Sequence, residues 1–271
     1  MQNSDVESTA GSSEQQGHSS ELLLAHSSDL HIGNHSGIED LGSLRSVIQT
    51  SVAEGADALV LAGDIFDHNR LRLEVLDAAA RLLGDAPIPV VVLPGNHDCL
   101  VPSSVYRRGG IGDPDNVYVF GVTDDDRIEI PELGLGFWGK PHVDYGSMSP
   151  LRDAPVRFAE HQVAVAHGHW LEHGRDEHRS WLITSEEMAA VDADYIALGH
   201  WDRATPAGDG STPAYYSGSP DLAGTLNLAG LNGSGADHVR RVKLLPWGKR
   251  EAADLARERE QFSSFQVPGS G

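Results

Sequence analysis

The sequence predicts an α/β protein, and three observations lead to this expectation. Short apolar runs alternate in the first hundred residues with segments whose apolar side chains have helical spacing. The runs are apolar at nearly every residue, as in strands that are covered on both faces of a sheet. Each run ends in polar residues, and in open α/β sheets ligands bind at the carboxyl ends of the strands.

The first part of the chain shows the alternation most regularly. Apolar runs at 22–26, 57–62 and 90–93 predict three strands, and the segments 38–53 and 71–83 predict the two helices between them. The resulting order of strand, helix, strand, helix and strand is typical of α/β architecture.

The second half is predicted to contain more strands. Short antiparallel strands are expected at 117–120, 127–130 and 135–138, and a hairpin loop in the Gly/Ser-rich stretch 230–236. Further strands are expected at 162–166, 195–198, 214–217 and 239–244.

No linker divides the chain strongly, so one catalytic domain is expected over residues 21–248. Residues 1–20 are rich in Ser, Gln, Gly and Glu and predict a disordered leader. Residues 249–271 predict a charged helix, over 249–261, with a loose tail. The apolar runs are too short for a signal core or a membrane span, which predicts a cytoplasmic protein without a membrane partner.

Composition narrows the classes of function. The 40 acidic residues exceed the 20 basic ones and give a formal charge of −20, which makes the chain a poor non-specific binder of nucleic acid or anionic membrane. Bound divalent cations would offset this charge locally, so a phosphate substrate is not excluded. The single cysteine, Cys99, excludes an intramolecular disulfide and a cysteine-rich zinc site. The 14 histidines are a first indication of metal chemistry.

Five polar clusters directly follow five of the predicted strands. They occupy residues 28–31, 63–67, 95–98, 167–169 and 199–202. Because strands of one sheet bring their carboxyl ends together, these clusters are expected to converge on one crevice. Their Asp, Asn and His side chains are ligands for manganese, iron or zinc rather than for a thiolate site. Two such ions, about 3.5–4 Å apart, can clamp a phosphoryl group and generate hydroxide at neutral pH.

The clusters resemble those of the calcineurin-like metallophosphoesterases. That pattern runs Asp-x-His, Gly-Asp-x-x-Asp, Gly-Asn-His-Asp/Glu, His and Gly-His-x-His, and the resemblance covers about residues 22–220. The stretches 26–33, 63–67 and 216–220 look closest to the DNA double-strand-break-repair exonuclease branch. The resemblance implies a four-layer α/β/β/α sandwich of two mixed sheets flanked by helices.

The resemblance also implies two divalent metal ions, with manganese as the first expectation and iron or zinc as alternatives. Six ligands carry over by position, namely Asp29 and His31 for the first ion, Asp64 as the bridge, and Asn96, His167 and His200 for the second. One position departs from the pattern, since Asp202 stands where the family has a histidine that binds the first ion. Asp202 either ligates that ion, and its negative charge then makes the metal a weaker Lewis acid, or it misses the ion and leaves a water there.

Catalysis is expected from His97, which by resemblance would stabilise developing charge and protonate the leaving oxygen after attack by metal-bound hydroxide. Asp67 would accept a hydrogen bond from His97 and fix its tautomer. Three further residues are candidate substrate contacts. These are His169, Arg107 and Trp201, for which an exposed loop, a solvated surface and the core are the respective structural alternatives.

Three functions stay open at this point. The first is a phosphodiesterase like the DNA-repair exonucleases, with DNA as a possible substrate; the second is a phosphomonoesterase acting on small molecules or proteins. The third is a non-catalytic scaffold, which the presence of His97 and a complete second ligand set disfavours. The metal, the physiological substrate, the oligomeric state and any partner ATPase are not determined by the sequence.

Overall fold

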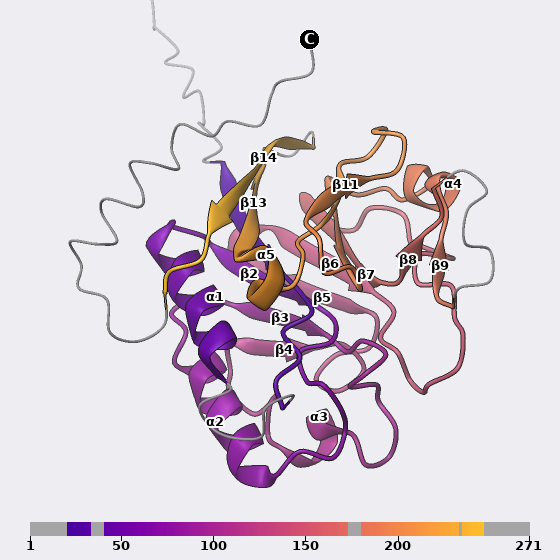
Figure 1. Ribbon diagram of the computed structural model, residues 1–271. Helices are drawn as coiled ribbons and strands as arrows, with labels where there is room; N and C mark the ends of the chain where they lie inside the picture. The colour runs from indigo at the N-terminus through magenta and orange to yellow at the C-terminus, as the bar shows by residue number, and fades with distance from the viewer. Residues whose placement is uncertain (1–20, 34–40, 173–179, 233–234, 247–271) are drawn as a thin grey trace, which may run out of the picture.

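The computed structural model describes residues 21–33, 41–172, 180–232 and 235–246 (Figure 1). Most strands in these ranges belong to two six-stranded sheets. The predicted leader, the predicted helix at 249–261 and the first residues of the predicted helix at 38–53 lie outside the described residues.

The first sheet carries the first three predicted strands side by side. Its order is β14 (Ala236–Lys243), β13 (Thr225–Leu231), β1 (Leu22–Ser27), β2 (Ala58–Ala62), β3 (Val90–Leu93) and β4 (Val117–Val119). Strands β1 to β4 are parallel, whereas β13 is antiparallel to both of its neighbours. Every residue of β2 and β3 is buried, as expected for strands covered on both faces.

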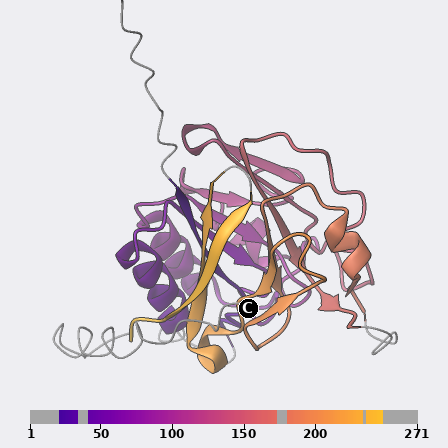
Figure 2. The same ribbon diagram turned by 90° about the horizontal axis from the view of Figure 1, so that it is seen from above.

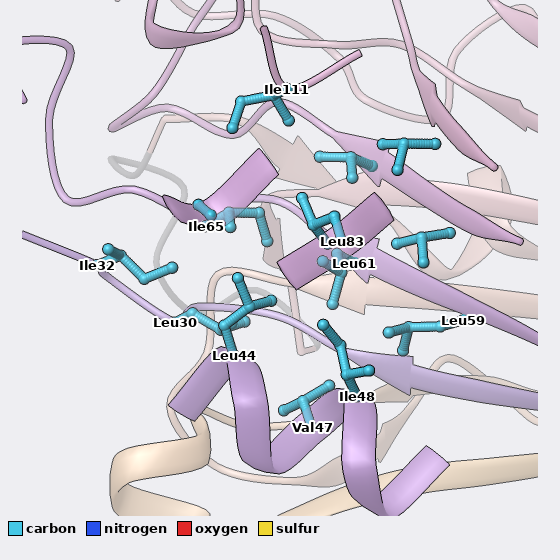
Figure 3. Packing of buried hydrophobic residues seen from close by; sticks show 14 of the residues in the cluster. Leu30, Ile32, Leu44, Val47, Ile48, Leu59, Leu61, Ile65, Leu83 and Ile111 are labelled. Atoms are coloured by element: carbon cyan, nitrogen blue, oxygen red, sulfur yellow. The ribbon is translucent and has the colours of Figure 1, made fainter. Parts of the chain in front are cut away.

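Two amphipathic helices cover the outer face of this sheet, α1 (Gly42–Ala53) and α2 (Leu73–Gly84). Figure 3 shows Leu44 and Ile48 of α1 directed toward the first sheet, with Ile48 on the side of Leu59 of β2, within one buried apolar cluster. Burial of each such side chain contributes about 1.5–3 kcal/mol. The packing holds β1 and β2 in place and so fixes where their carboxyl ends lie.

The second sheet packs on the other face of the first (Figure 2). Its order is β11 (Thr205–Ala207), β12 (Ala214–Tyr216), β10 (Tyr195–Gly199), β7 (His161–His167), β6 (Leu135–Gly139) and β5 (Arg127–Ile130). The four central strands are parallel and the two edge strands antiparallel. Side chains from both sheets, among them Val60, Val91 and Val163, form the apolar layer between them.

The outer face of the second sheet is covered by a thinner layer. It contains helix α4 (Ser185–Ala189) and the pair of strands β8 (His169–Trp170) and β9 (Leu182–Ile183). The remaining short helices are α3 (Val105–Arg108), η2 (Pro131–Leu133) and α5 (Pro220–Ala223). The predicted sandwich of two mixed sheets with flanking helices is therefore confirmed.

The expected antiparallel arrangement is confirmed for β5 and β6, which pair with each other, but it is wrong for β4, which extends the first sheet in parallel beside β3. On its other side, β6 is parallel to β7. Strand β13 was not predicted at all, although it lies between β1 and β14. Its Thr-Leu-Asn-Leu-Ala-Gly-Leu sequence mixes residues of low strand propensity with leucines, so only the pairing on both sides reveals it.

Candidate metal centre

The five polar clusters meet where five parallel strands end. Strands β1, β2 and β3 of the first sheet lead into residues 28–31, 63–67 and 95–98, and strands β7 and β10 of the second sheet end at His167 and Gly199. Backbone hydrogen bonds join the loops: Asp29 N–H donates to Gly63 O (3.0 Å) and His31 N–H to Asp64 O (3.1 Å). The site thus spans the carboxyl edges of both sheets.

The backbone at this edge is strained. Among the described residues other than glycine, six have a positive φ, and four of these are Asp29 (55°), His31 (46°), Asp64 (52°) and His200 (104°). A non-glycine residue in such a conformation costs about 1–3 kcal/mol and persists only where the surroundings enforce it. Strain concentrated on four predicted ligands indicates that side-chain placement is maintained at the expense of stability.

Two motif glycines leave space for the side chains of the site. A Cβ atom at Gly63, where φ is 91°, would overlap the imidazole of His167. A Cβ atom at Gly95 would overlap the carboxylate of Asp64. Glycine is required at both positions because these polar groups approach the backbone closely.

The buried half of the site is centred on His167. Its Nδ1 donates to Ala62 O (2.9 Å) and thereby directs Nε2 toward Asn96 Oδ1 (3.0 Å) and Asp64 Oδ2 (3.1 Å). Ligand atoms of Asp64, His167 and His200 all lie within 4.8 Å of one another. A histidine whose second nitrogen donates to a carbonyl is held in one tautomer and orientation, which is the usual arrangement of a metal-binding imidazole.

A second group shares Asp64 with the first. Ligand atoms of Asp29, His31 and Asp64 also lie within 4.8 Å of one another. The Asp29 carboxylate accepts hydrogen bonds from Ser28 Oγ (2.5 Å) and from the backbone N–H of His200 (3.0 Å), which ties the first sheet to the second. Behind it, Ser28 Oγ lies 2.8 Å from Ser217 Oγ, in the segment that follows β12.

The third group, His31, Asp67 and His97, is more open. His97 Nδ1 donates to the backbone carbonyl of Asp67 (2.9 Å), while the Asp67 carboxylate lies 3.9 Å from His97 and 3.2 Å from His31 Nδ1. The expected partnership of Asp67 and His97 therefore runs through the backbone oxygen. The His97 side chain is 45% exposed and its ring lies 4.8 Å from that of His31.

The charges of the buried half favour a cation between these groups. Burial alone would raise the pKa of Asp64, but the facing His167 holds it below its usual range. Burial alone would lower the pKa of His167, but the Asp64 and Asp29 carboxylates raise it to about 9. Burial raises the pKa of Asp29. Burial and the neighbouring His167 lower the pKa of His200 to about 3, so this imidazole is neutral and free to ligate.

This donor set fits divalent metal ions. It offers two buried carboxylates, Asp29 and Asp64, with an amide oxygen and imidazoles, and none of the ion pairs among the described residues brings a Lys or Arg to these carboxylates. Two carboxylates buried so close together need positive charge, which a divalent ion supplies. Oxygen and imidazole ligands suit manganese, iron or zinc.

Asp202 lies apart from all three groups. Its side chain is exposed, and it belongs to none of the groups of possible ligands found in the described part of the chain. It lines a separate hollow with Arg203 and Arg241. Of the two alternatives predicted for Asp202, this geometry favours the one in which its carboxylate does not reach the first ion.

The three candidate substrate contacts have different positions. His169 is buried and its Nδ1 accepts a hydrogen bond from Trp201 Nε1 (3.1 Å), with its ring 6.2 Å from that of His200. Trp201 is half-buried and stacks on Tyr216, at 4.5 Å between ring centres. Arg107 is exposed in α3 and is not brought into the three groups.

Four residues of the site were not among the predicted site residues, although two of them, Asp98 and Ser217, lie within the motif stretches 95–98 and 216–220. The buried Asp98 carboxylate accepts from Gly95 N, Phe66 N and Tyr106 Oη, and so ties the second and third clusters together. Burial and the nearby Asp64 raise the pKa of Asp98 to about 6.

Of the other three residues, Ser217 has been described above, and His142 and Trp181 lie in loops of the second sheet. His142 Nε2 donates to His167 O (2.9 Å). Trp181, with φ of 57°, places its ring 5.7 Å from that of His200 and donates from Nε1 to Gly146 O (2.7 Å). Nothing in the spacing of the sequence connects these loops to the metal centre.

Comparison with known proteins places this geometry in a family. The family model described as calcineurin-like phosphoesterase matches residues 22–203. Three bacterial or archaeal relatives align at low identity. The SbcD component of the SbcCD nuclease of Bacillus subtilis is 26% identical over 77% of this chain and 64% of its own length. The uncharacterized metallophosphoesterase YhaO of the same species is 26% identical over 66% of this chain and 48% of its own.

The DNA double-strand break repair protein Mre11 of Aeropyrum pernix is 35% identical over 28% of this chain and 20% of its own length. The alignments thus span less than two thirds of each of these relatives. The crystal structure of TT1561 from Thermus thermophilus superposes over 83% of this chain and 99% of its own, with a TM-score of 0.56 at 14% identity. This likeness supports the fold alone.

In the described residues, no helix has the length and apolar character needed to span a membrane.

Proposed function

Because the chain belongs to the calcineurin-like phosphoesterase family, we propose that it is a phosphodiesterase of the nuclease type that works with two divalent metal ions. The observation that carries the proposal is the position of Asp64, which is shared by two groups of ligand atoms, one containing His167 and His200 and the other Asp29 and His31. A carboxylate common to two such groups is the expected bridge of a two-ion centre.

The residues that would hold the ions are those of the two groups together with Asn96, and manganese is the ion we expect there. Asp29, His31 and Asp64 would hold one ion, and the second would take Asp64, Asn96, His167 and His200. When bound, such a pair neutralises charge on a phosphoryl group and acidifies the attacking water.

His97 would supply the proton for the leaving oxygen. Because Asp67 O can only accept, the hydrogen bond of 2.9 Å requires a proton on His97 Nδ1. The second nitrogen, Nε2, is then the atom that carries the transferable proton when the ring is protonated. The His97 side chain is 45% exposed, which leaves room for a substrate. The backbone oxygen of Asp67 and the edge of His31 orient its ring.

The choice of a diester over a monoester rests on the relatives. One carries the name of a nuclease component and another that of a DNA repair protein, and both align with this chain over only part of their own length. A DNA substrate, a partner ATPase and a cytoplasmic location are therefore predictions for this chain.

The test is a side-by-side assay of the manganese-loaded chain on single-stranded DNA, a cyclic nucleotide and a phosphomonoester. We expect the diesters to be hydrolysed faster than the monoester. Preference for the monoester would replace the proposal by a phosphatase function, and absence of hydrolysis of all three substrates with two ions bound would contradict the enzyme proposal.

A further inference from the structure

A hollow close to the metal centre contains two arginines that the proposed reaction does not use. It has a volume of about 610 Å³ and is lined by Asp202, Arg203, Ala204, Leu222, Ala223 and Arg241. These residues come from three segments, namely the turn between β10 and β11, helix α5 and strand β14. We call it the arginine hollow. Its volume is in the range of small-molecule sites, about 300–1,000 Å³.

Hydrogen bonds hold the three segments together. Ser219 N–H, at the start of α5, donates to Asp202 O (3.1 Å), and Arg241 Nη2 on β14 donates to Ala204 O (2.6 Å). The Arg241 guanidinium is thus already fixed against the turn that follows His200. A binding group held in place loses little conformational entropy when a ligand arrives.

Arg203 and Arg241 differ from the neighbouring Arg240 in whether a carboxylate pairs with their charge. Arg240, the residue before Arg241 on β14, forms an ion pair with Glu54 (3.0 Å) on the other side of the strand. Among the ion pairs found in the described residues, none involves Arg203 or Arg241. In a chain with a formal charge of −20, two such guanidinium groups at one hollow form a local site for anions.

The arginine hollow is within reach of a substrate at the metal centre. Arg203 follows His200 by three residues, so their Cα atoms lie no more than roughly 10–11 Å apart. Every nucleotide of a strand carries one phosphate, so the phosphates that flank the scissile one lie within a distance of this size. A strand whose scissile phosphate lies beside His200 can therefore place a neighbouring phosphate at Arg203.

We propose that the arginine hollow binds a phosphate flanking the scissile bond of a single nucleic-acid strand, with Arg203 and Arg241 as the donors. The apolar side chains of Leu222 and Ala223 provide a surface for the attached sugar or base. The proposal rests on the proposed phosphodiesterase function and narrows its substrate to a strand with several phosphates.

The test compares two substrates of the manganese-loaded chain, a short oligothymidylate and bis(4-nitrophenyl) phosphate, which has a single phosphate. For Arg203→Ala combined with Arg241→Ala we expect the KM for the oligonucleotide to rise about tenfold, and at least fivefold more than the KM for the small diester. Binding of a fluorescent oligothymidylate to metal-free protein, followed by anisotropy, should lose about 0.7 from its slope of log K against log salt, the value for the one phosphate that the two arginines contact.

Arg240→Ala is the matched control, because it removes the same charge from the same strand on its opposite face. We expect it to leave the KM for both substrates and the salt slope as in the wild type. Equal weakening by Arg240→Ala, or an unchanged oligonucleotide KM in the double variant, would overturn the arginine hollow as a binding site. Hydrolysis of bis(4-nitrophenyl) phosphate in the same experiment shows separately whether the proposed function holds.

Discussion

The two halves of the metal centre are built on opposite principles. In the buried half, His167 is fully buried and fixed by a hydrogen bond to Ala62 O, and its other nitrogen faces Asn96 and Asp64. In the open half, His97 is 45% exposed and is held by a single backbone carbonyl and the edge of His31. Burial fixes ligands in place, whereas exposure leaves a proton donor accessible to substrate. The comparison predicts that damage to the two halves has different consequences.

The largest effect is expected at Asp64, which the group with His167 and His200 shares with the group of Asp29 and His31. Asp64→Asn should remove metal from both of these groups and reduce hydrolysis to background, because the neutral amide cannot balance two ions. His167→Asn should lower metal content only in the group that contains His200. Metal analysis of the two purified variants tests this difference, with circular dichroism as the control for folding.

Thermal unfolding gives a second reading of the same variants. Metal at 100 times its dissociation constant stabilises a native site by about 2.7 kcal/mol. The wild-type melting temperature should therefore rise with added manganese, while that of Asp64→Asn should not. A rise of equal size in the variant would show that Asp64 is not the shared ligand.

The next effect belongs to the open half. His97→Gln should reduce kcat by about 10²–10⁴-fold, the usual contribution of a general acid, while both ions stay bound. The measurement is kcat on a diester together with metal content. Loss of metal together with activity would place His97 among the ligands, which its grouping with His31 and Asp67 makes a concrete alternative.

A smaller effect on metal affinity is expected at Asp98, which contacts the loops that carry the ligands. Asp98 accepts hydrogen bonds from Gly95 N and Phe66 N, in the loops that carry Asn96 and Asp64. Asp98→Asn should lower metal affinity about 10–100-fold, as is typical for groups that orient ligands, without changing the identity of the ligands. Isothermal titration with manganese measures this affinity. An affinity equal to that of the wild type would mean that the loops hold their shape without Asp98.

The sequence predicted the convergence of the site better than its details. Asp29 and Asp64 could be placed together because parallel strands of one sheet share a carboxyl edge, whereas His167 lies at the carboxyl edge of the second sheet, where the strand-end rule was applied to one sheet only. The edge-on approach of Trp181 to His200 could not be predicted, since it depends on loops of the second sheet whose course no periodicity specifies. Strand β13 was missed for a similar reason, because its pairing with β1 is a long-range contact.

The sequence also does not predict which oxygen of Asp67 accepts the hydrogen bond from His97. The motif indicates that Asp67 and His97 are neighbours, but the backbone conformation decides whether the carbonyl or the carboxylate accepts the hydrogen bond. The structure places the carbonyl at 2.9 Å and the carboxylate nearer His31, at 3.2 Å. Residue identity thus predicts which residues meet, and only the folded chain determines which atoms do.

The smallest effect is expected at Asp202, and it provides the sharpest test of the comparison. The carboxylate is exposed and lies outside the three ligand groups, so Asp202→Ala should leave the manganese content at the level of the wild type. Asp202→His introduces the residue that the family pattern has at this position. If the backbone after His200 directs position 202 outward, as its place in the arginine hollow indicates, the new imidazole will point in the same direction. Manganese content and affinity will then change by less than about twofold, within about 0.5 kcal/mol, as for surface substitutions away from special features. A clear gain in affinity for Asp202→His would show instead that the side chain at position 202 can reach the first ion, and that this ion lacks one ligand only because the chain carries aspartate there.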